Sequence, residues 1–196
     1  MCARQLFADR GVRGVTMSDV AHRSGCSRQM VYKVFFDRRE LVLAAAVERI
    51  MEIADIAASR SSGPEALVSA AQDAMFAHSF VELSVHVIET LRSDPELVIL
   101  FGEGSPVTFH EALWEPELTE RALRFWFPWL EWGRANGVLR TDLSNRDLAD
   151  WLHTVYASII LRRNIPQEEE RSMIERFVLT SLAMATVGGE RNDVVR

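Results

Sequence analysis

The chain has 196 residues, 48% hydrophobic and 26% charged, and its net charge at pH 7 is −6. With 10 glycines and 6 prolines, this composition is typical of a packed globular protein and excludes a disordered or collagen-like chain. No apolar run approaches the roughly 20 residues of a membrane span. The first residues lack a secretory signal pattern, and Cys2 and Cys26 lack a metal or redox spacing, so a cytoplasmic location is expected.

The charges are distributed unevenly along the chain. Residues 1–50 hold nine Arg or Lys and five Asp or Glu, a net charge of +4, whereas the remaining 146 residues hold 13 and 23, a net charge of −10. This asymmetry concentrates positive potential at one end, where phosphates bind, and keeps the other end away from nucleic acid. Chance variation of surface charge is the alternative explanation.

Two short helices are predicted at the start of the chain. Residues 3–10 form the first, with Leu6 and Phe7 facing inward. The second begins after Thr16, which is a good N-cap, and Asp19 three residues later completes a capping-box-like start.

The run Ser24-Gly25-Cys26 separates the second helix from a third over residues 28–34, which Ser27 caps. Glycine suits a sharp turn because it adopts left-handed backbone angles without strain. Two short helices joined by such a turn are typical of a helix-turn-helix, whose second helix enters the DNA major groove. The pattern therefore predicts sequence-specific DNA binding.

Hydrophobic residues of the third helix are expected to face the core. Met30, Val31 and Val34 occupy the positions assigned to burial, and Phe35-Phe36 closes the core beneath them. Cys26 is expected to be a buried small hydrophobic residue, and a redox switch is the alternative.

Polar residues at the start of the third helix supply the chemistry of DNA recognition. Arg28 can form two hydrogen bonds to a guanine edge, and Gln29 can do the same to adenine. The predicted DNA contacts are Thr16, Ser18, Ser27, Arg28, Gln29, Tyr32, Lys33 and Arg39. The alternative for each is a solvated surface residue. Because one helix-turn-helix reads few base pairs, a dimer on a palindromic site is expected.

A long helix is predicted from Arg38 to about Ser59, opened by a second capping box in which Glu40 follows Asp37 by three residues. Ser-Ser-Gly-Pro at 61–64 is the clearest linker. The expected division is a DNA-binding domain over 1–48 and a helical domain over 49–196.

Residues 3–50 resemble the N-terminal domain of the TetR family of bacterial transcriptional repressors. The matching segments are L-F-A-D-R-G, T-M-S-D-V-A-H-R-S-G-C-S and V-Y-K-V-F-F-D-R-R-E-L. The resemblance implies an all-α fold with a C-terminal ligand-binding and dimerisation domain, and a regulator rather than an enzyme, without a cofactor. The family carries further basic residues before the position of Met1, so either the first helix is truncated or the true start lies upstream.

The second domain is rich in aromatic residues, which suit a cavity for an apolar or flat ligand. Pro128 interrupts a helix that holds several of them, and a kink or a free carbonyl is expected there. The predicted ligand-binding residues are Phe76, Phe80, His86, Phe101, Phe109, Trp126, Trp129, Trp151 and Tyr156. A packed aromatic core is the alternative.

His78, Glu82 and His86 are spaced four residues apart and share one helix face. Imidazole and carboxylate groups at this spacing can hold a divalent metal, with His110 or His153 completing the set. No metal is assigned to the chain, and the three residues are weak candidates. A solvated stripe or hydrogen bonds to a polar ligand are the alternatives.

Two amphipathic helices are predicted at the C-terminus, over residues 145–163 and 167–187. The resemblance implies that they pack against their copies in a homodimer. The expected seam consists of Ala157, Ile160, Ile174, Phe177, Val178, Ser181, Leu182 and Ala185. Closing the core of one chain is the alternative role.

The expected protein is a repressor that binds a palindromic operator as a dimer and is released by a small apolar or aromatic effector. The alternative is a helical enzyme or metal-binding protein that uses the face of His78, Glu82 and His86.

Overall fold

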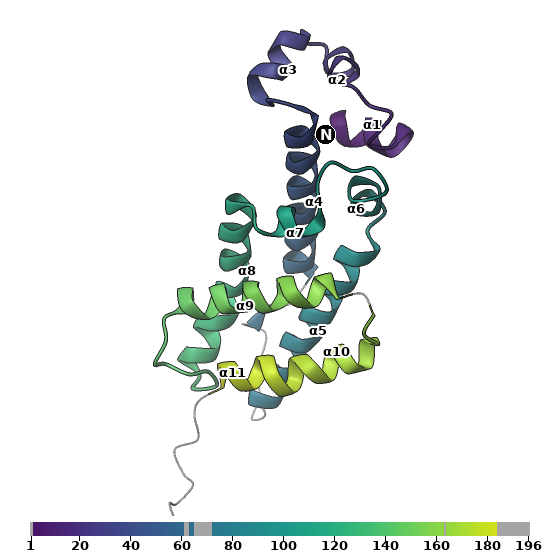
Figure 1. The fold of residues 1–196 in the computed structure, drawn as a ribbon. Coiled ribbons are helices and arrows are strands. Elements are labelled where there is room, and N and C mark those ends of the chain that lie inside the picture. The colour runs from purple at the N-terminus through teal and green to yellow at the C-terminus, as the bar shows by residue number, and fades with distance from the viewer. Residues whose placement is uncertain (1, 61–62, 65–71, 163, 184–196) are drawn as a thin grey trace, which may run out of the picture.

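The computed structural model describes residues 2–60, 63–64, 72–162 and 164–183, and every named element within them is helical (Figure 1). The all-helical class predicted from the sequence is confirmed. The elements are α1 (Cys2–Arg10), α2 (Met17–Arg23), α3 (Arg28–Val34), α4 (Arg38–Arg60), α5 (Gln72–Ser93), α6 (Pro95–Leu100), α7 (Phe109–Leu113), α8 (Pro116–Ala135), α9 (Asn145–Leu161), α10 (Gln167–Met173), the π-helix η2 (Ile174–Leu179) and α11 (Thr180–Leu182).

Helices α1 to α3 form one end of an elongated molecule, and α4 leads from them into the larger helical body (Figure 1). Leu6 and Phe7 of α1 are buried as expected, together with Val20 and Ala21 of α2 and Leu41 of α4. A continuous hydrophobic core therefore connects helices α1 to α3 with the long helix α4, which also packs in the larger helical body.

The capping residues of the small end lie as predicted. The Thr16 side chain accepts a hydrogen bond from the Asp19 amide, and the Asp19 carboxylate accepts one from the Thr16 amide. Ser27 caps α3 through the Met30 amide, and Gly25 adopts a φ of 65°, which places the left-handed turn between α2 and α3. At the start of α4 the Asp37 carboxylate accepts from the Glu40 amide.

The larger body is built on α4, α5, α8 and α9, and α10 to α11 cover α5 (Figure 1). Helix α8 continues through Pro128, which is exposed at the surface. None of the described helices is long and apolar enough to cross a membrane.

The final helix differs from the single segment expected over 167–187. It passes from α10 through the π-helix η2 to α11 and ends at Leu182, and an isolated bridge then joins Ala183 to Leu139. The Leu182 carbonyl accepts a hydrogen bond from the Arg140 amide, so the chain leaves the helix to pair with the turn after α8. Residues 184–187 of the expected helix lie outside the described residues.

Four side chains that were expected to be buried are exposed. Met30 is 52% exposed, Val34 63% and Phe36 83%, and Cys26 is also exposed. The short α3 packs on the domain through Val31 alone, so neighbouring hydrophobic residues point away from the core. The expectation assigned too wide a buried face to a helix of seven residues.

Candidate DNA-binding surface and ligand cavity

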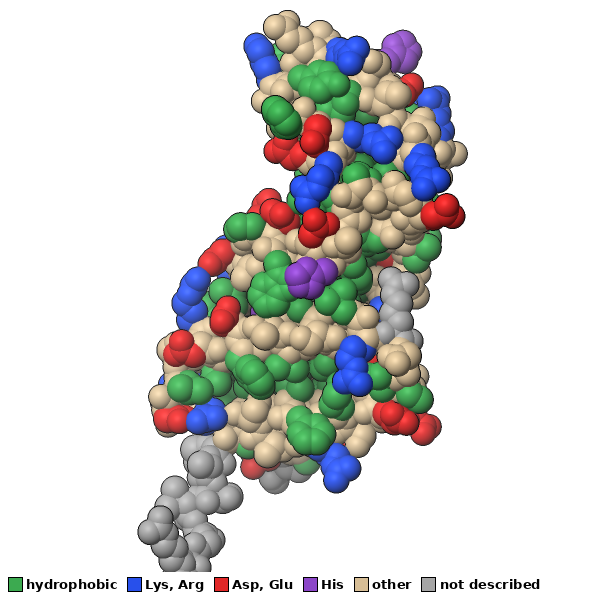
Figure 2. Space-filling model, viewed as in Figure 1, with side chains coloured by type: hydrophobic (Ala, Val, Ile, Leu, Met, Phe, Trp, Pro, Cys, Tyr) green, Lys and Arg blue, Asp and Glu red, His purple; other side chains and the backbone are tan. Residues whose placement is uncertain are grey.

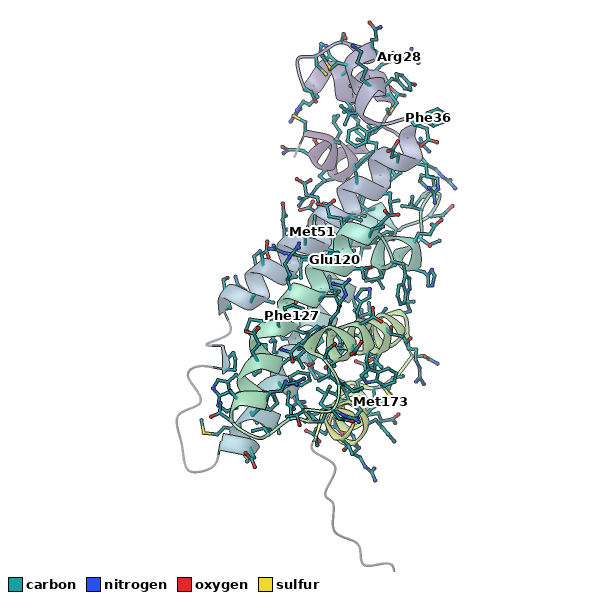
Figure 3. All side chains as sticks on the ribbon, turned by 90° about the vertical axis from the view of Figure 1, so that its left-hand side faces the viewer. Arg28, Phe36, Met51, Glu120, Phe127 and Met173 are labelled. Carbon is teal, nitrogen blue, oxygen red and sulfur yellow. The ribbon has the colours of Figure 1, made fainter. Side chains whose placement is uncertain are left out.

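Helix α3 presents almost its whole surface to solvent at the end of the molecule. Among its residues only Val31 is buried, and Figure 3 shows Arg28 and Phe36 at the tip, far from Met173 in the helical body. Basic side chains gather over this end in the space-filling view (Figure 2). An exposed two-turn helix on a basic domain has the shape and charge needed to enter a DNA groove.

Arg28 and Tyr32 interact on the exposed side of α3. The Arg28 guanidinium carbon lies 5.3 Å from the centre of the Tyr32 ring, and its Nη2 atom is 3.4 Å from the Tyr32 hydroxyl. The ring therefore holds the guanidinium on the outer face of the helix, one turn from the N-cap.

All eight residues predicted to contact DNA are exposed: Thr16, Ser18, Ser27, Arg28, Gln29, Tyr32, Lys33 and Arg39. Thr16 and Ser27 use their hydroxyl groups as helix caps. Arg39 donates a hydrogen bond of 2.6 Å to Glu111 of α7, so its guanidinium joins the two parts of the molecule.

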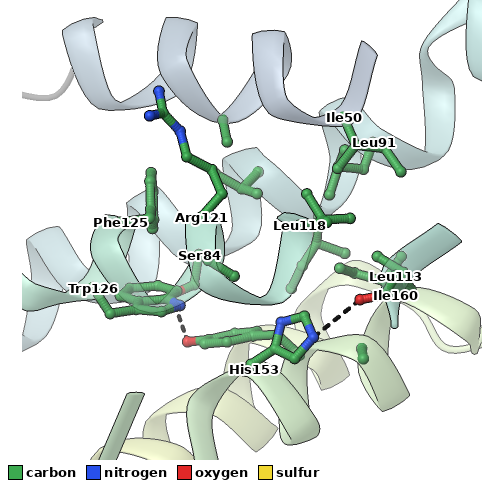
Figure 4. Close-up of a pocket in the computed structure, with 16 residues that line it drawn as sticks. Ile50, Ser84, Leu91, Leu113, Leu118, Arg121, Phe125, Trp126, His153 and Ile160 are labelled. Atoms are coloured by element: carbon green, nitrogen blue, oxygen red, sulfur yellow. Dashed lines mark hydrogen bonds between the residues drawn. The ribbon is translucent and has the colours of Figure 1, made fainter. Parts of the chain in front are cut away.

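A mostly apolar cavity of about 80 Å³ lies inside the helical body, between α4, α5, α7, α8 and α9 (Figure 4). Its lining residues are Ile50, Ala54, Ser84, Val87, Ile88, Leu91, Leu113, Leu118, Arg121, Ala122, Phe125, Trp126, His153, Tyr156, Ala157 and Ile160. A ligand here would be enclosed by side chains from five helices, including the helix that leads to α3.

Few polar groups interrupt the cavity wall. The Ser84 hydroxyl donates to the Phe80 carbonyl at 2.7 Å and lies 2.6 Å from the Tyr156 hydroxyl. His153 Nε2 is 3.0 Å from the Leu113 carbonyl oxygen. Burial lowers the pKa of His153 despite this hydrogen bond, and burial also raises the pKa of Tyr156, so both side chains are neutral at pH 7.

The structure brings two of the predicted ligand residues into the cavity wall, Trp126 and Tyr156, whose rings stack 5.1 Å apart. Phe76, Phe80 and Trp129 pack against one another with centroids 5.8–6.1 Å apart. The other predicted residues also lie away from the lining: Phe101 and Phe109 stack at 4.9 Å, Trp151 donates to Ser181, and His86 is exposed.

Sequence reasoning missed most of the lining because it followed aromatic residues alone. Leu118, Arg121, Ala122 and Phe125 recur at helical spacing before Trp126, and His153 lies one turn before Tyr156. That shared spacing was the available signal, since it places small and aliphatic residues on the same face as the aromatic ones.

The proposed metal face does not assemble into a site within the described residues. Glu82 forms an ion pair with Arg171, which lowers the pKa of its carboxyl group. His78 Nδ1 lies 3.9 Å from Glu82 Oε1, and His86 is exposed. Across the described part of the chain, no group of three or more His, Cys, Asp or Glu is arranged to hold a metal.

A network of ion pairs joins α1, α4 and α6. Arg4 of α1 is 9% exposed and binds Glu52 of α4 at 2.6 and 2.8 Å and Glu96 of α6 at 2.8 and 3.1 Å. Arg49 of α4 binds the same Glu52 and also Asp94, the N-cap of α6. Glu48 of α4 also lies 3.6 Å from Arg4, so two arginines and four carboxylates form the network between the small domain and the helical body.

The charges of this network shift one another's ionisation. The hydrogen bond from Arg4 lowers the pKa of Glu52 to about 2. Burial alone raises the pKa of Asp94, but the hydrogen bonds from Arg49 and the Leu97 amide lower it overall. The carboxyl groups of Glu52 and Asp94 are thus charged at neutral pH.

Comparisons with known proteins agree with this geometry. The model of the bacterial regulatory proteins of the tetR family matches residues 2–45. Two uncharacterized HTH-type transcriptional regulators of Mycobacterium tuberculosis strains are 23% identical over 189 residues, which is 96% of this chain and 86% of theirs.

Solved structures share the fold over nearly the whole chain. The TetR family repressor AlkX of Dietzia sp. strain DQ12-45-1b has a TM-score of 0.60 and 22% identity, with 92% of each chain covered. The transcriptional repressor QsdR of R. erythropolis has a TM-score of 0.61 and 18% identity, covering 95% of this chain and 97% of that one. The small helical domain and the larger helical body thus occur together in both proteins.

Proposed function

Because the chain is a transcriptional regulator of the TetR family, we propose that it is a repressor that an effector releases from DNA. It binds a palindromic operator as a homodimer and leaves it when a small apolar or aromatic molecule fills the cavity. The observation that carries the proposal is the exposure of α3, in which every residue except Val31 faces solvent. Helix α4 joins the domain that contains α3 to the helical body that contains the apolar cavity. The protein acts on the chromosome, hence in the cytoplasm.

DNA recognition is assigned to residues 1–48 and effector binding and dimerisation to residues 49–196. Arg28 and Gln29 read base edges, and Tyr32 and Lys33 hold phosphates. The remaining predicted contacts, to the DNA backbone, are Thr16, Ser18, Ser27 and Arg39. Arg39 must share its guanidinium between phosphate and Glu111, to which it is bound here.

The dimer interface is assigned to the outward face of α9 and α10 to α11, where Trp151, Leu161 and Phe177 are exposed. Hydrophobic side chains gather on this face in Figure 2. Of the seam residues expected from the sequence, Phe177 lies on the face and Ser181 is partly buried beside it. Ala157, Ile160, Ile174, Val178 and Leu182 are buried inside the chain, and Ala185 lies outside the described residues.

The effector acts through the helices that carry both the cavity wall and the ion-pair network. Ile50 lines the cavity and is next to Arg49, and Leu91 lines it three residues before Asp94. Because a cavity of 80 Å³ is smaller than the roughly 150 Å³ that accommodates benzene, a larger effector must displace these helices. The displacement would reach α1 through Arg4 and separate the two α3 helices.

The test is binding of the full-length protein to the DNA upstream of its own gene, across a salt series. The wild type is expected to bind one palindromic site tightly, with an affinity that falls steeply as salt rises. The double variant Arg28→Ala, Gln29→Ala should lose specific binding and keep weak, salt-dependent binding.

A matched control is Arg146→Ala, which removes an exposed arginine of the helical body that pairs with Glu120 of α8. It should bind the operator like the wild type. Absence of specific DNA binding by the wild type, or equal loss in both variants, would contradict the proposal.

A further inference from the structure

The hydrogen-bond directions in the cavity wall determine which polar group a ligand can present. Ser84 has one hydroxyl proton and donates it to the Phe80 carbonyl, which can only accept. The Tyr156 hydroxyl must therefore be the donor in its 2.6 Å contact with Ser84. Its own oxygen is left with lone pairs only, so toward the cavity Tyr156 is an acceptor.

His153 has the same polarity. Its Nε2 faces the Leu113 carbonyl, so the ring proton resides on Nε2 and Nδ1 of the neutral imidazole carries a lone pair. In Figure 4 the second ring nitrogen faces away from the Leu113 carbonyl. Tyr156 and His153, one turn apart on α9, thus both carry acceptor lone pairs.

Arg121, the one charged side chain among the lining residues, does not supply a cation for a negatively charged ligand. Arg121 forms an ion pair with Asp55 of α4, and Figure 4 shows its guanidinium pointing away from Ser84 and His153. An anionic ligand would therefore meet lone pairs and hydrocarbon without a free cation, and would lose its hydration uncompensated.

We propose that the effector is an uncharged, largely hydrocarbon molecule with a hydrogen-bond donor, a hydroxyl or N–H group, received by the Tyr156 oxygen. This inference rests on the proposed function only in calling the ligand an effector. The hydrogen-bonding groups of the cavity wall select the same ligand whether or not the protein binds DNA. Carboxylates and ligands whose polar group only accepts are disfavoured.

The experiment compares three probes with the same ring: cyclohexanol, cyclohexanone and cyclohexanecarboxylate. Each is titrated into the full-length protein without DNA and followed by calorimetry. Cyclohexanol should bind about tenfold more tightly than cyclohexanone, the effect of one satisfied hydrogen bond, and the carboxylate more weakly than both.

Two variants test the hydrogen-bond directions. Tyr156→Phe keeps the ring stacked on Trp126 and should lower cyclohexanol affinity about tenfold while leaving cyclohexanone within about twofold. Ser84→Ala frees the Tyr156 proton, so it should raise cyclohexanone affinity and reduce the preference for the alcohol. Thr90→Val removes a hydroxyl from α5 outside the lining and should change neither.

Equal or tighter binding of the ketone or the carboxylate, no saturable binding of the alcohol, or an unchanged preference in Ser84→Ala would overturn the inference. None of these results bears on operator binding. Conversely, a protein that binds no operator but prefers the alcohol would remove the proposed function and keep the polarity of the cavity.

Discussion

Lys33 has an unusual position in this chain, because it is the sole lysine among 22 basic residues. It lies exposed in the last turn of α3, next to Tyr32. An arginine can form a fixed, two-pronged bond to a base, whereas an ammonium group is a compact charge that suits a phosphate. We therefore expect Arg28 to read base edges and Lys33 to bind phosphate on one short helix.

A single lysine makes this surface accessible to selective chemistry. Acetylation with an amine-specific reagent should modify Lys33 and the N-terminal amine in free protein, and operator DNA should reduce the rate at Lys33 at least about fivefold, since phosphates cover it. Peptide mass spectrometry measures both rates. Modification of Lys33 that is unaffected by operator DNA would place the lysine outside the interface.

The two kinds of contact should respond differently to substitution. Gln29→Ala is expected to cost about 1–3 kcal/mol on the operator and to relax the preference at one base pair, with the salt dependence unchanged. Lys33→Ala should weaken binding to all sequences and lower the salt slope by about 1. Titrations on the operator and on a scrambled site at several salt concentrations separate these effects.

At the residue level, capping was predictable and burial on α3 was not. Thr16, Asp19 and Ser27 act through neighbours within four residues, so their roles follow from local sequence. Exposure of Met30 and Phe36 depends on how little of α3 touches the core, which is a property of the tertiary fold. The sequence offered His153 only as one of two histidines that could complete a weak metal set, because its hydrogen-bond partner, the Leu113 carbonyl, is 40 residues away.

Among the helices, the short α6 forms ion pairs with both α1 and α4. It spans six residues, yet Asp94 at its N-cap binds Arg49, and Glu96 in its first turn binds the buried Arg4. It follows directly on α5, whose Leu91 lines the cavity. Short and held by ion pairs at its start, α6 is suited to transmit movement of the wall to α1.

Removing the charge of Glu96 should therefore weaken the coupling more than either binding step. In Glu96→Gln the effector-induced loss of operator affinity is expected to shrink at least about fivefold, the lower end of typical allosteric coupling. Operator titrations with and without saturating effector measure it. Asp142→Asn, which breaks an exposed ion pair elsewhere, is the control and should keep full coupling.

The same network predicts a dependence of stability on acidity. Glu52 has a pKa of about 2 in the folded chain against about 4.5 when unfolded, so its pairing stabilises the fold above pH 4.5 and is lost as pH falls toward 2. Allowing for solvent screening, its contribution is about 1 kcal/mol.

Urea unfolding at pH 7 and at pH 3 measures this effect. Because other carboxylates also titrate, the relevant quantity is the difference in free energy of unfolding between the wild type and Glu52→Gln. That difference should shrink at pH 3. A difference that grows at low pH would show that the carboxylate is not stabilised by Arg4.

Helix positions along the chain were largely predictable, and the irregular ends were not. Helix α4 and helix α9 begin and end within two residues of the limits that their amphipathic, helical periodicity predicted. The pairing of Ala183 with Leu139 depends on the distant turn after α8, for which the local sequence holds no signal, and the π-helix η2 was not predicted either. The same holds for the ion pairs of α6, since Arg4 and Glu96 are 92 residues apart.

For the whole molecule, the proposed DNA-binding helix α3 lies at one end of an elongated shape, and the cavity and the proposed dimer face lie in the helical body (Figure 1). A repressor of this shape needs the dimer to fix the spacing of its two α3 helices. Phe177, at 69% exposure, is the most exposed large hydrophobic residue of that face. A substitution at Phe177 should therefore disrupt dimerisation without disturbing the fold of the single chain.

Phe177→Glu is expected to give a folded monomer with strongly reduced operator affinity. The substitution places two like charges in the proposed interface but alters an exposed position, so the free energy of unfolding of the chain itself should change by less than about 0.5 kcal/mol. Sedimentation equilibrium gives the mass. Val98→Glu, at an exposed hydrophobic position of α6, should remain dimeric.

The burial of Arg4 limits how freely the DNA-binding domain can be exchanged between relatives. Its guanidinium is 9% exposed and donates hydrogen bonds to Glu52 and Glu96, both outside the small domain, and it also pairs with Glu48 at 3.6 Å. A chimera that joins this domain to another body would remove the two carboxylates that accept hydrogen bonds from Arg4, and it is expected to be destabilised. Biosensors assembled from such parts would function only where residues 4, 52 and 96 are transferred together.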